Sequence, residues 1–452
     1  ILGESNMGRP VKIEGLPEHP ASQGGTSAMA QASLLDLYDP DRGKGIEYWG
    51  DPGSWDDFVI EARGIIDTLR PQQGRGIRIL TETVTSPALA AMITQFLEQN
   101  PRAVWHQYEP VNSDNARRAS MTAFGEFVDT HYAFDKADLV VSLDADFLGS
   151  GPAHVRYARD FAKRRDVVDH HEGEEHHELS RLYAIEGSPT ITGASADHCL
   201  AVRPSRVERI ARAIANEFGV RGVAAGSGEL SVDEVKWVNA IVEDLKAHRG
   251  ASIVIAGDRQ SPAVHAIAHA LNHANQNVGQ TVFHTEPVEA NPGYQGESLE
   301  TLLKDMDAGN VEFLLMFDGN PIYNAPKVAG ASAEAGDLSF QAALDKVATR
   351  AHIALSPNET SEWCHWYIPR AHDLETWGDA RAYDGTVSLI QPLIAPFYGG
   401  KSPLEVFSAL TENEERSAYD VLKGYWESER PSGNFESFWA ESLSSGMIVR
   451  TQ

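Results

Sequence analysis

Cysteine and basic residues are both scarce in this chain of 452 residues. Its two cysteines, Cys199 and Cys364, lie far apart, which excludes a cysteine-rich iron–sulfur or zinc motif. Whether they form a disulfide stays open at this stage. Lys and Arg number 38 against 65 Asp and Glu, so the formal net charge is −27. Nucleic acids and anionic lipid surfaces require a basic face, so this charge argues against both partners and permits a cationic protein partner.

Long apolar runs are absent as well. No stretch approaches the roughly 18 residues of a membrane-spanning helix, so we expect no direct membrane span. A hydrophobic fraction of 42% with 23% charged residues is typical of a soluble, well-cored protein. The sequence opens mid-phrase at Ile1, with no initiator methionine and no recognisable signal peptide, and we expect a fragment or a processed chain.

From about residue 75, short apolar stretches alternate with amphipathic ones. Predicted strands lie at 77–81, 103–108, 139–143, 252–256, 281–284, 311–317 and 352–355, with helices between them. Such alternation predicts an α/β fold with parallel sheets and right-handed crossovers. We expect two α/β units, at 49–200 and 201–355, followed by a mixed segment at 356–452.

The histidine- and acid-rich run at 169–178 is the most conspicuous local feature. Its imidazoles, His170, His171, His176 and His177, permit a metal-binding module. However, His171 and His176 are five residues apart rather than the four of a zinc-protease helix. A solvated loop is therefore the favoured interpretation, because charged blocks usually face water.

Other polar residues follow predicted strands. Asp144 and Asp146 come directly after the strand at 139–143, where they either act chemically or cap the next helix. Gly319, Asn320 and Pro321 follow the strand at 311–317 and either approach a nucleotide or form a turn. No glycine-rich dinucleotide fingerprint, phosphate-binding P-loop or nucleophile elbow occurs. The residues alone therefore indicate no catalytic constellation, and the adjacent Cys364 and His365 do not define one.

Several short sequence motifs together resemble those of the molybdopterin oxidoreductases. They lie at 8–15, 17–20, 37–42, 319–321, 368–375 and 384–387. Two further phrases, at 142–148 and 377–386, are similar to the B subunit of alternative complex III, a bacterial membrane assembly that oxidises quinol. The resemblance covers essentially the whole chain. It implies a fold like that of formate dehydrogenase and DMSO reductase, with residues 1–48 resembling the cluster-binding domain and 356–452 returning onto the first α/β domain.

The sequence departs from that family where cofactors would bind. Ser27 stands where catalytic members have the last cysteine of an iron–sulfur site, and Met29 stands where they have a basic residue. In the first dinucleotide loop, Asp144 and Asp146 would face an anionic diphosphate, which like charge opposes. We therefore expect no metal and no cofactor in this chain, with Ser27, Asp144, Asp146, Gly319 and Asn320 as vestigial positions.

The resemblance implies a non-catalytic scaffold within a quinol-oxidising electron-transfer complex. Expected partners are an iron–sulfur cluster domain or subunit, a multihaem c-type cytochrome and integral membrane quinol-binding subunits, so that iron–sulfur clusters and haem c belong to the partners. The expected location is the extracytoplasmic (periplasmic) side of the bacterial membrane. The alternative is an active molybdopterin reductase of a small sulfur compound, in which Ser113 or Ser120 would ligate the metal and Gly319 and Asn320 would contact one pterin dinucleotide.

Overall fold

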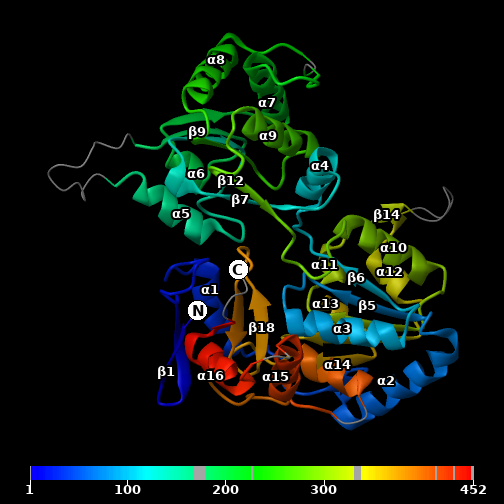
Figure 1. Ribbon diagram of the computed structural model, residues 1–452. Coiled ribbons are helices and arrows are strands. Elements are labelled where there is room, and N and C mark those ends of the chain that lie inside the picture. Colours follow the sequence, from blue (N-terminus) through cyan, green and yellow to red (C-terminus); the bar gives the residue numbers. More distant parts are fainter. Residues whose placement is uncertain are drawn as a thin grey trace. The chain divides into compact units, whose positions relative to one another are not determined.

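The computed structural model describes residues 2–166, 179–224, 226, 228–329, 337–412, 415–430 and 433–448 (Figure 1). The histidine-rich run at 169–178 lies outside these residues. The chain divides into two compact units. Unit 1 comprises Ile1–Pro20, Thr26–Asn112 and Val288–Gln452, and unit 2 comprises Ala21–Gly25 and Ser113–Pro287.

A seven-stranded sheet with the strand order β4-β3-β17-β16-β13-β5-β6 forms the centre of unit 1. Five of its strands are parallel: β5 (Ile77–Thr81), β6 (Val104–Gln107), β13 (Phe313–Phe317), β16 (Thr349–Ala354) and β17 (Trp366–Pro369). The hairpin of β3 (Glu47–Tyr48) and β4 (Asp51–Pro52) extends the sheet antiparallel to β17.

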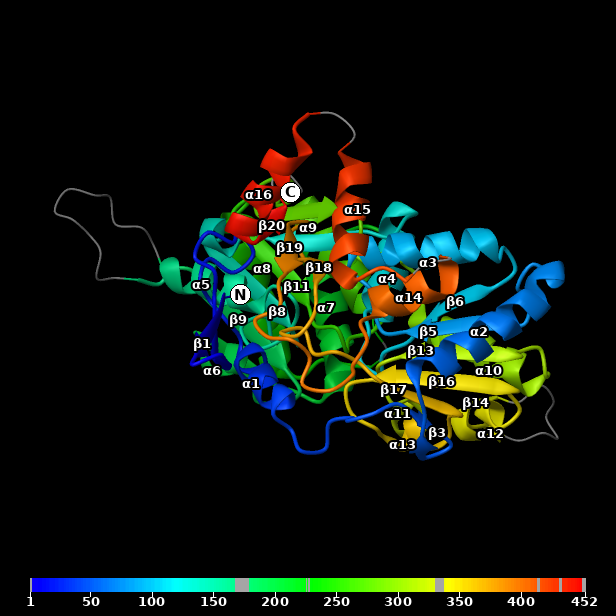
Figure 2. The same ribbon diagram turned by 90° about the horizontal axis from the view of Figure 1, so that it is seen from below.

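The central strands of this sheet are apolar on both sides because helices cover both faces. On β13, Phe313, Leu315 and Phe317 pack with one layer, made of α2 (Trp55–Leu69), α3 (Pro87–Gln99), α14 (Pro403–Thr411) and α15 (Ala418–Glu429). Leu314 and Met316 alternate with them and pack with α10 (Gln295–Asp307) and α12 (Phe340–Leu344). Helices α14 and α15 contact α3, so the C-terminal residues complete one layer of unit 1 (Figure 2).

Smaller elements of unit 1 surround this sheet. The N-terminal residues form the hairpin of β1 (Leu2–Asn6) and β2 (Arg9–Glu14) and then α1 (Ala28–Leu37). The C-terminal residues add a three-stranded antiparallel sheet and a last helix: β18 (Gly378–Arg381), β19 (Val387–Ile390), β20 (Met447–Ile448) and α16 (Phe435–Ser445). Short connections contain α11 (Pro321–Asn324), α13 (Glu359–Glu362), β14 (Val328–Ala329) and β15 (Asp337–Leu338).

A parallel sheet with the strand order β10-β9-β8-β11 forms the centre of unit 2. Its strands are β8 (Leu139–Leu143), β9 (Arg181–Glu186), β10 (His198–Ala201) and β11 (Ser252–Ala256). One apolar cluster joins them to α7 (Pro204–Phe218), α8 (Val232–Ala247) and α9 (Pro262–Ala274). Unit 2 also contains α4 (Asp114–Phe124), α5 (His154–Lys163), α6 (Ile191–Ala194) and the antiparallel pair of β7 (Asp129–Tyr132) and β12 (Val282–Thr285).

The predicted α/β class with two parallel-sheet units is confirmed, and the limits of the units differ from the expected 49–200 and 201–355. Unit 2 is inserted between β6 and β13, because β13 pairs with β5 and β11 pairs with β8. Hydrophobic runs locate parallel strands along the chain but do not say which strands pair, since central strands such as β8 and β13 are apolar on both faces and look alike.

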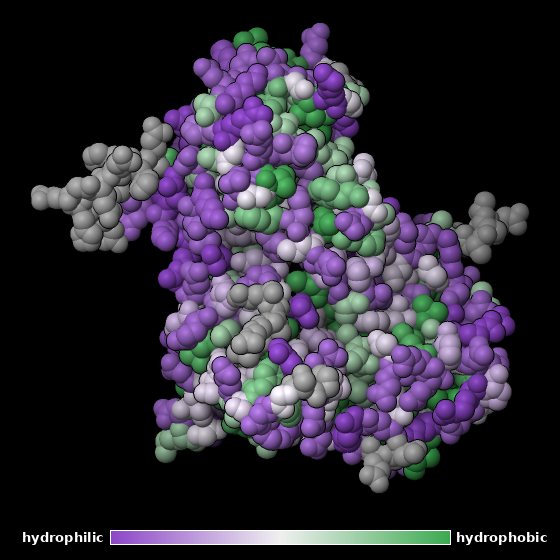
Figure 3. Space-filling view, viewed as in Figure 1, coloured by the Kyte–Doolittle hydropathy of each residue, from purple (hydrophilic) through white to green (hydrophobic). Residues whose placement is uncertain are grey.

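The helices of the described residues lack either the length or the apolar character that crossing a membrane requires. On the face of the molecule shown in Figure 3, hydrophilic residues predominate and hydrophobic residues form small separate clusters. This surface agrees with the abundance of acidic residues in the sequence.

Candidate functional site

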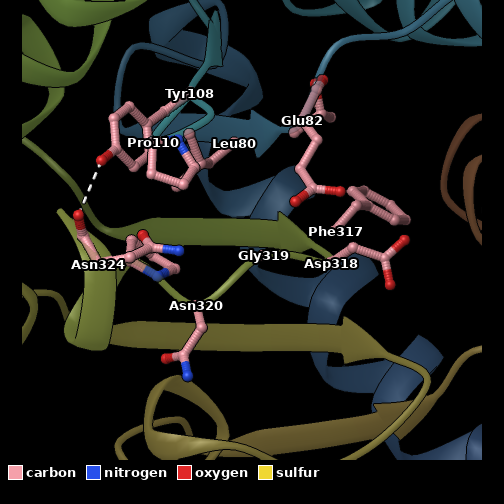
Figure 4. Close-up of a pocket in the computed structure, with 11 residues that line it drawn as sticks. Leu80, Glu82, Tyr108, Pro110, Phe317, Asp318, Gly319, Asn320 and Asn324 are labelled. Carbon is pink, nitrogen blue, oxygen red and sulfur yellow. Dashed lines mark hydrogen bonds between the residues drawn. The ribbon is translucent and has the colours of Figure 1, made fainter. Parts of the chain in front are cut away.

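A hollow lies at the carboxyl ends of the central strands of unit 1 (Figure 4). Strand β5 pairs with β6 on one side and with β13 on the other, so the strand order reverses there. Open α/β sheets bind ligands at such a point, because the connections on the two sides leave in opposite directions. The hollow is lined by Leu80, Thr81, Glu82, Tyr108, Pro110, Phe317, Asp318, Gly319, Asn320, Pro321 and Asn324.

The loop after β13 starts with two residues in the left-handed region. Asp318 has φ of 52° and Gly319 has φ of 71°. The Asp318 N–H donates to the Ile353 carbonyl at 2.8 Å, and buried His352 lies 3.1 Å from the Asp318 carbonyl through its Nε2. The Asp318 carboxylate pairs with Arg370, whose Nε is 3.0 Å and 2.9 Å from its two oxygens. These bonds hold an unusual backbone conformation in place.

Glu82 follows β5 and points into the same hollow (Figure 4). Desolvation by the surrounding protein atoms raises the pKa of Glu82 to about 7, although part of the residue still contacts solvent. The carboxylates of Asp318 and Glu109 raise the pKa further, and Arg370 lowers it. Glu109 accepts a hydrogen bond from the Thr83 N–H at 2.8 Å. Two acidic side chains, Glu82 and Asp318, therefore line the hollow, and Glu109 and Arg370 lie close enough to influence the Glu82 carboxyl group.

Gly319 and Asn320, the residues of this loop expected to contact a ligand, form hydrogen bonds with other residues of the protein instead. The Asn320 amide donates to Glu359 at 2.6 Å and accepts from the Thr360 hydroxyl at 2.9 Å, so its side chain is turned away from the hollow (Figure 4). The Gly319 carbonyl accepts from the Asn358 amide at 3.0 Å. The water-accessible volume of the hollow is about 10 Å³, which is room for about one water molecule.

Unit 2 has the same kind of reversal, because β8 pairs with β9 on one side and with β11 on the other. Asp144 follows β8 with φ of 60°, and its N–H donates to the Ile185 carbonyl at 2.7 Å. Its carboxylate accepts from the Gly187 N–H at 2.9 Å and from the Gln260 amide at 2.7 Å. A methyl group on Gly257 would lie 1.9 Å from the Asp144 carbonyl oxygen, so only glycine fits there.

Asp146 stabilises the next turn of the same loop. One carboxylate oxygen accepts from the Thr192 N–H at 3.1 Å and from the Thr192 hydroxyl at 2.8 Å. Thr192 lies in the short helix α6. Asp146 does not cap the next helix in the chain, α5, whose N-cap is Ala153; it bonds instead to α6, through Thr192, which lies 46 positions later. The geometry thus places both acidic side chains in bonds within unit 2.

The remaining predicted positions also have local structural roles. Ser27 is the N-cap of α1 and accepts from the Ala30 N–H at 3.0 Å, while Met29 is 80% exposed. Ser113 precedes α4, and the buried Ser120 hydroxyl donates to the Arg117 carbonyl at 2.9 Å. Among the described residues, no group of three or more His, Cys, Asp or Glu has a geometry that could hold a metal ion.

Cys199 and Cys364 are free thiols, which answers the question that the sequence left open. The Cys364 thiol donates to the Thr360 carbonyl at 3.1 Å, and burial raises its pKa to about 12. The neighbouring His365 ring instead lies against Trp49, with ring centroids 4.3 Å apart. A thiol of this kind is a poor nucleophile.

Sequence reasoning missed Glu82, Glu109 and Arg370. Glu82 directly follows the predicted strand at 77–81, so its position after a central strand was available as a signal. Arg370 lies within a phrase noted only for its family resemblance. Its pairing with Asp318 joins residues 52 positions apart, and no local pattern indicates such a pair.

Comparisons with known proteins add the family context. No protein-family model matches the chain. It is 22% identical over 454 aligned positions to the menaquinone reductase molybdopterin-binding-like subunit of Nitratidesulfovibrio vulgaris, covering 89% of this chain and 61% of that protein. The chain thus spans about three fifths of the length of this curated relative. The structure matches acetylene hydratase from Pelobacter acetylenicus, which has a molybdopterin oxidoreductase-type fold, with a TM-score of 0.60, 12% identity, and 93% of this chain and 68% of that chain covered.

The chain has a molybdopterin oxidoreductase-type fold. The resemblance to that broad family stated from the sequence is confirmed. The two reversal points described above are therefore the places where a pterin dinucleotide would be sought in this fold. Neither site fits such a group as it stands. In unit 2, Asp144 and Asp146 occupy the hydrogen-bond donors of the loop. In unit 1, the acidic side chains Glu82 and Asp318 line the small hollow, and Glu109 adds negative charge beside it.

Proposed function

We propose that this molybdopterin oxidoreductase-like chain is a subunit of a quinone-oxidoreductase complex and that it holds no pterin cofactor of its own. The likeness to a menaquinone reductase subunit supports the class of complex. The proposal makes the chain a scaffold rather than the catalytic centre. Fold alone would not distinguish the two roles, since function depends on the site.

The main observation behind the proposal is that the hydrogen-bond donors around the loop that starts at Asp144 already bind a carboxylate of the protein itself. A cofactor diphosphate binds through backbone N–H groups and neutral or cationic donors. Here the Gly187 N–H and the Gln260 amide both donate to the Asp144 carboxylate, which is itself an anion. A diphosphate at this place would have to displace that carboxylate and then remain beside it, and unscreened like charges at such range cost several kcal/mol.

The N-terminal segment supports the same conclusion for an iron–sulfur cluster. The Ser27 hydroxyl caps α1, and a hydroxyl is a poor replacement for the thiolate that such clusters need. We therefore place clusters and haem c in the partners: an iron–sulfur domain or subunit, a multihaem c-type cytochrome and integral membrane quinol-binding subunits. The proposed assembly is of the alternative complex III type, on the periplasmic side of the membrane.

Metal analysis of the purified native assembly tests this proposal. We expect quinol oxidation by the assembly, no stoichiometric molybdenum or tungsten, and no fluorescent pterin after acid oxidation. Stoichiometric molybdenum with a pterin, lost in a variant of Ser113 or Ser120, would instead establish the active molybdopterin reductase. Purification of the full chain as a stable monomer without any partner would remove the scaffold role.

A further inference from the structure

Helix α1 is rich in apolar residues, but most of their side chains are not buried against the rest of unit 1. Seven of its ten residues are apolar, yet Leu37 is its one buried residue. Met29 and Leu35 are 80% and 70% exposed. A helix of this composition is normally covered by other parts of a protein, because exposed apolar surface is unfavourable in water.

The exposed side chains at the end of α1 continue into a second segment of unit 1. Tyr38 is the C-cap of α1, and its ring lies 5.9 Å from that of Phe397. Leu393 lies in the same loop as Phe397, and Gly3 of β1 packs against it. Leu35, Tyr38, Leu393 and Phe397 are 70%, 44%, 37% and 47% exposed, and we call these four residues the α1 patch.

The α1 patch stands on a rigid base. The Phe397 N–H donates to Glu375 at 2.9 Å, and the Leu393 N–H donates to the Leu374 carbonyl at 2.9 Å. Glu375 in turn forms a two-pronged ion pair with Arg42, at 3.1 Å and 2.7 Å, with both side chains almost fully buried. A surface fixed in this way loses little conformational entropy when a partner binds.

The acidic residues near the α1 patch favour a partner with a positively charged surface. Asp36, Asp39 and Asp41 are all exposed and lie within the same short stretch as Leu35 and Tyr38. An anionic membrane would be repelled by these carboxylates. A second copy of the chain, docked symmetrically, would place the same carboxylates against each other. A protein surface with apolar residues bordered by Lys and Arg satisfies both features.

We propose that the α1 patch is the docking surface for one cationic partner subunit. This inference rests on the proposed function, since it requires the chain to be part of an assembly. Tyr38 and Phe397 would be its central anchors, because aromatic side chains on a rigid base dominate interface energies. The acidic residues would increase the association rate and make it sensitive to salt.

Affinity purification of the tagged full chain from its own cells tests this surface. We expect the wild-type chain to co-purify with one stoichiometric subunit. The amount of that subunit should fall about tenfold or more with the double variant Leu35→Ser, Phe397→Ser. Tyr323→Ser removes a more exposed aromatic residue of unit 1 outside the patch and should leave that subunit bound. Melting temperatures near that of the wild type for both variants would show that folding is unaffected.

A second pair of variants tests the charge requirement without removing apolar contacts. Asp36→Lys with Asp41→Lys should weaken retention and reverse its salt dependence, whereas Glu98→Lys, an exposed acidic residue on α3, should not. A photo-crosslinker at Leu35 should label the same subunit, within a segment rich in Lys and Arg. Labelling of phospholipid, or of a second copy of this chain, would overturn the proposal.

Full retention of every subunit by the Leu35→Ser, Phe397→Ser variant would also overturn it. That result would leave the proposed function intact, because the chain would still assemble. Failure of the wild-type chain to assemble with any subunit would reject the proposed function first.

Discussion

The loop after β13 of unit 1, which starts at Asp318, and the loop after β8 of unit 2, which starts at Asp144, share a backbone conformation but are stabilised by different interactions. We call them the Asp318 loop and the Asp144 loop. Both aspartates follow a central parallel strand, both have φ between 50° and 60°, and both donate their N–H to a carbonyl of the neighbouring strand. Asp318 is balanced by the charged Arg370, beside two further carboxylates. Asp144 is held by the neutral donors of Gly187 and Gln260.

This difference determines how each loop would respond to a perturbation. In unit 2 the constraint is steric and depends on close backbone approach, so small changes in volume should be costly. In unit 1 the constraint is electrostatic and partly exposed, so it should depend on charge, pH and salt. We therefore expect the stability of the Asp144 loop to be insensitive to salt and pH, and that of the Asp318 loop to depend on both.

The largest expected contrast comes from replacing Gly319, within the Asp318 loop, and Gly257, which follows β11 and packs against the Asp144 backbone. Gly257→Ala would place a methyl group 1.9 Å from the Asp144 carbonyl oxygen, so we expect a loss of at least about 3 kcal/mol in unfolding free energy. Gly319→Ala meets nothing closer than 3.8 Å and should lose about 1–2 kcal/mol, from the left-handed backbone alone. Urea denaturation of both variants measures the difference, and equal losses would contradict the steric interpretation.

Removing the cation of unit 1 should have the next largest effect. Arg370→Met leaves Asp318, Asp373 and Glu82 without their common counter-charge, and its side chain is 19% exposed. We expect a loss of about 2 kcal/mol, less than the 3–5 kcal/mol of a fully buried pair. Gln260→Leu in unit 2 is the neutral counterpart, with an expected loss of about 1–2 kcal/mol. Only the Arg370→Met loss should become smaller in high salt, as denaturation at two salt concentrations would show.

These contrasts also show what the sequence can predict. The strands at 77–81, 139–143 and 252–256 agree with β5, β8 and β11 because each is a short apolar run between turn residues. In the structure, Ser86 is the N-cap of α3 and Pro87 its first residue, and both residue types favour a helix start through local effects alone. Patterns of this kind depend on neighbouring residues, so one sequence is enough to find them.

The unit boundaries and the partners of Asp144 were not available from the sequence. The insertion of unit 2 depends on the pairing of β13 with β5, more than 200 residues earlier, which apolar patterns do not encode. The Gln260 amide lies 116 positions from Asp144. The sequence left the choice between a chemical role and capping of the next helix open for Asp144 and Asp146. The structure shows that neither caps that helix, because their carboxylates accept bonds from Gly187, Gln260 and Thr192 instead.

Conservative replacement of the two aspartates should sharpen the charge difference. Asp144→Asn keeps an acceptor for the Gly187 N–H, and the Gln260 amide could rotate to match, so we expect a loss below about 1 kcal/mol. Asp318→Asn loses the ion pair to Arg370 and should cost about 1 kcal/mol, with a lower pKa for Glu82. Calorimetry of both variants at low and high salt checks this, and a salt-sensitive Asp144→Asn would contradict it.

The smallest expected effect is a pH dependence that belongs to unit 1 alone. The pKa of Glu82 is raised to about 7 in the folded chain, so between its unfolded value and pH 7 the folded state binds more protons than the unfolded state. Wild-type stability should therefore fall as pH rises through this window, and Glu82→Gln should remove that part of the decline. Because Glu82 is exposed, we expect about 1 kcal/mol or less.

Denaturation of wild type and Glu82→Gln at pH 5 and pH 8 measures this difference, with Glu98→Gln as the control for an exposed acid of the same unit. NMR titration of the Glu82 carboxyl carbon should give a midpoint near 7, shifted upward in Arg370→Met because the cation that lowers it is gone. A midpoint near that of an ordinary glutamate would mean that the hollow is fully hydrated. The electrostatic half of the comparison would then fail, while the steric account of the Asp144 loop would stand unchanged.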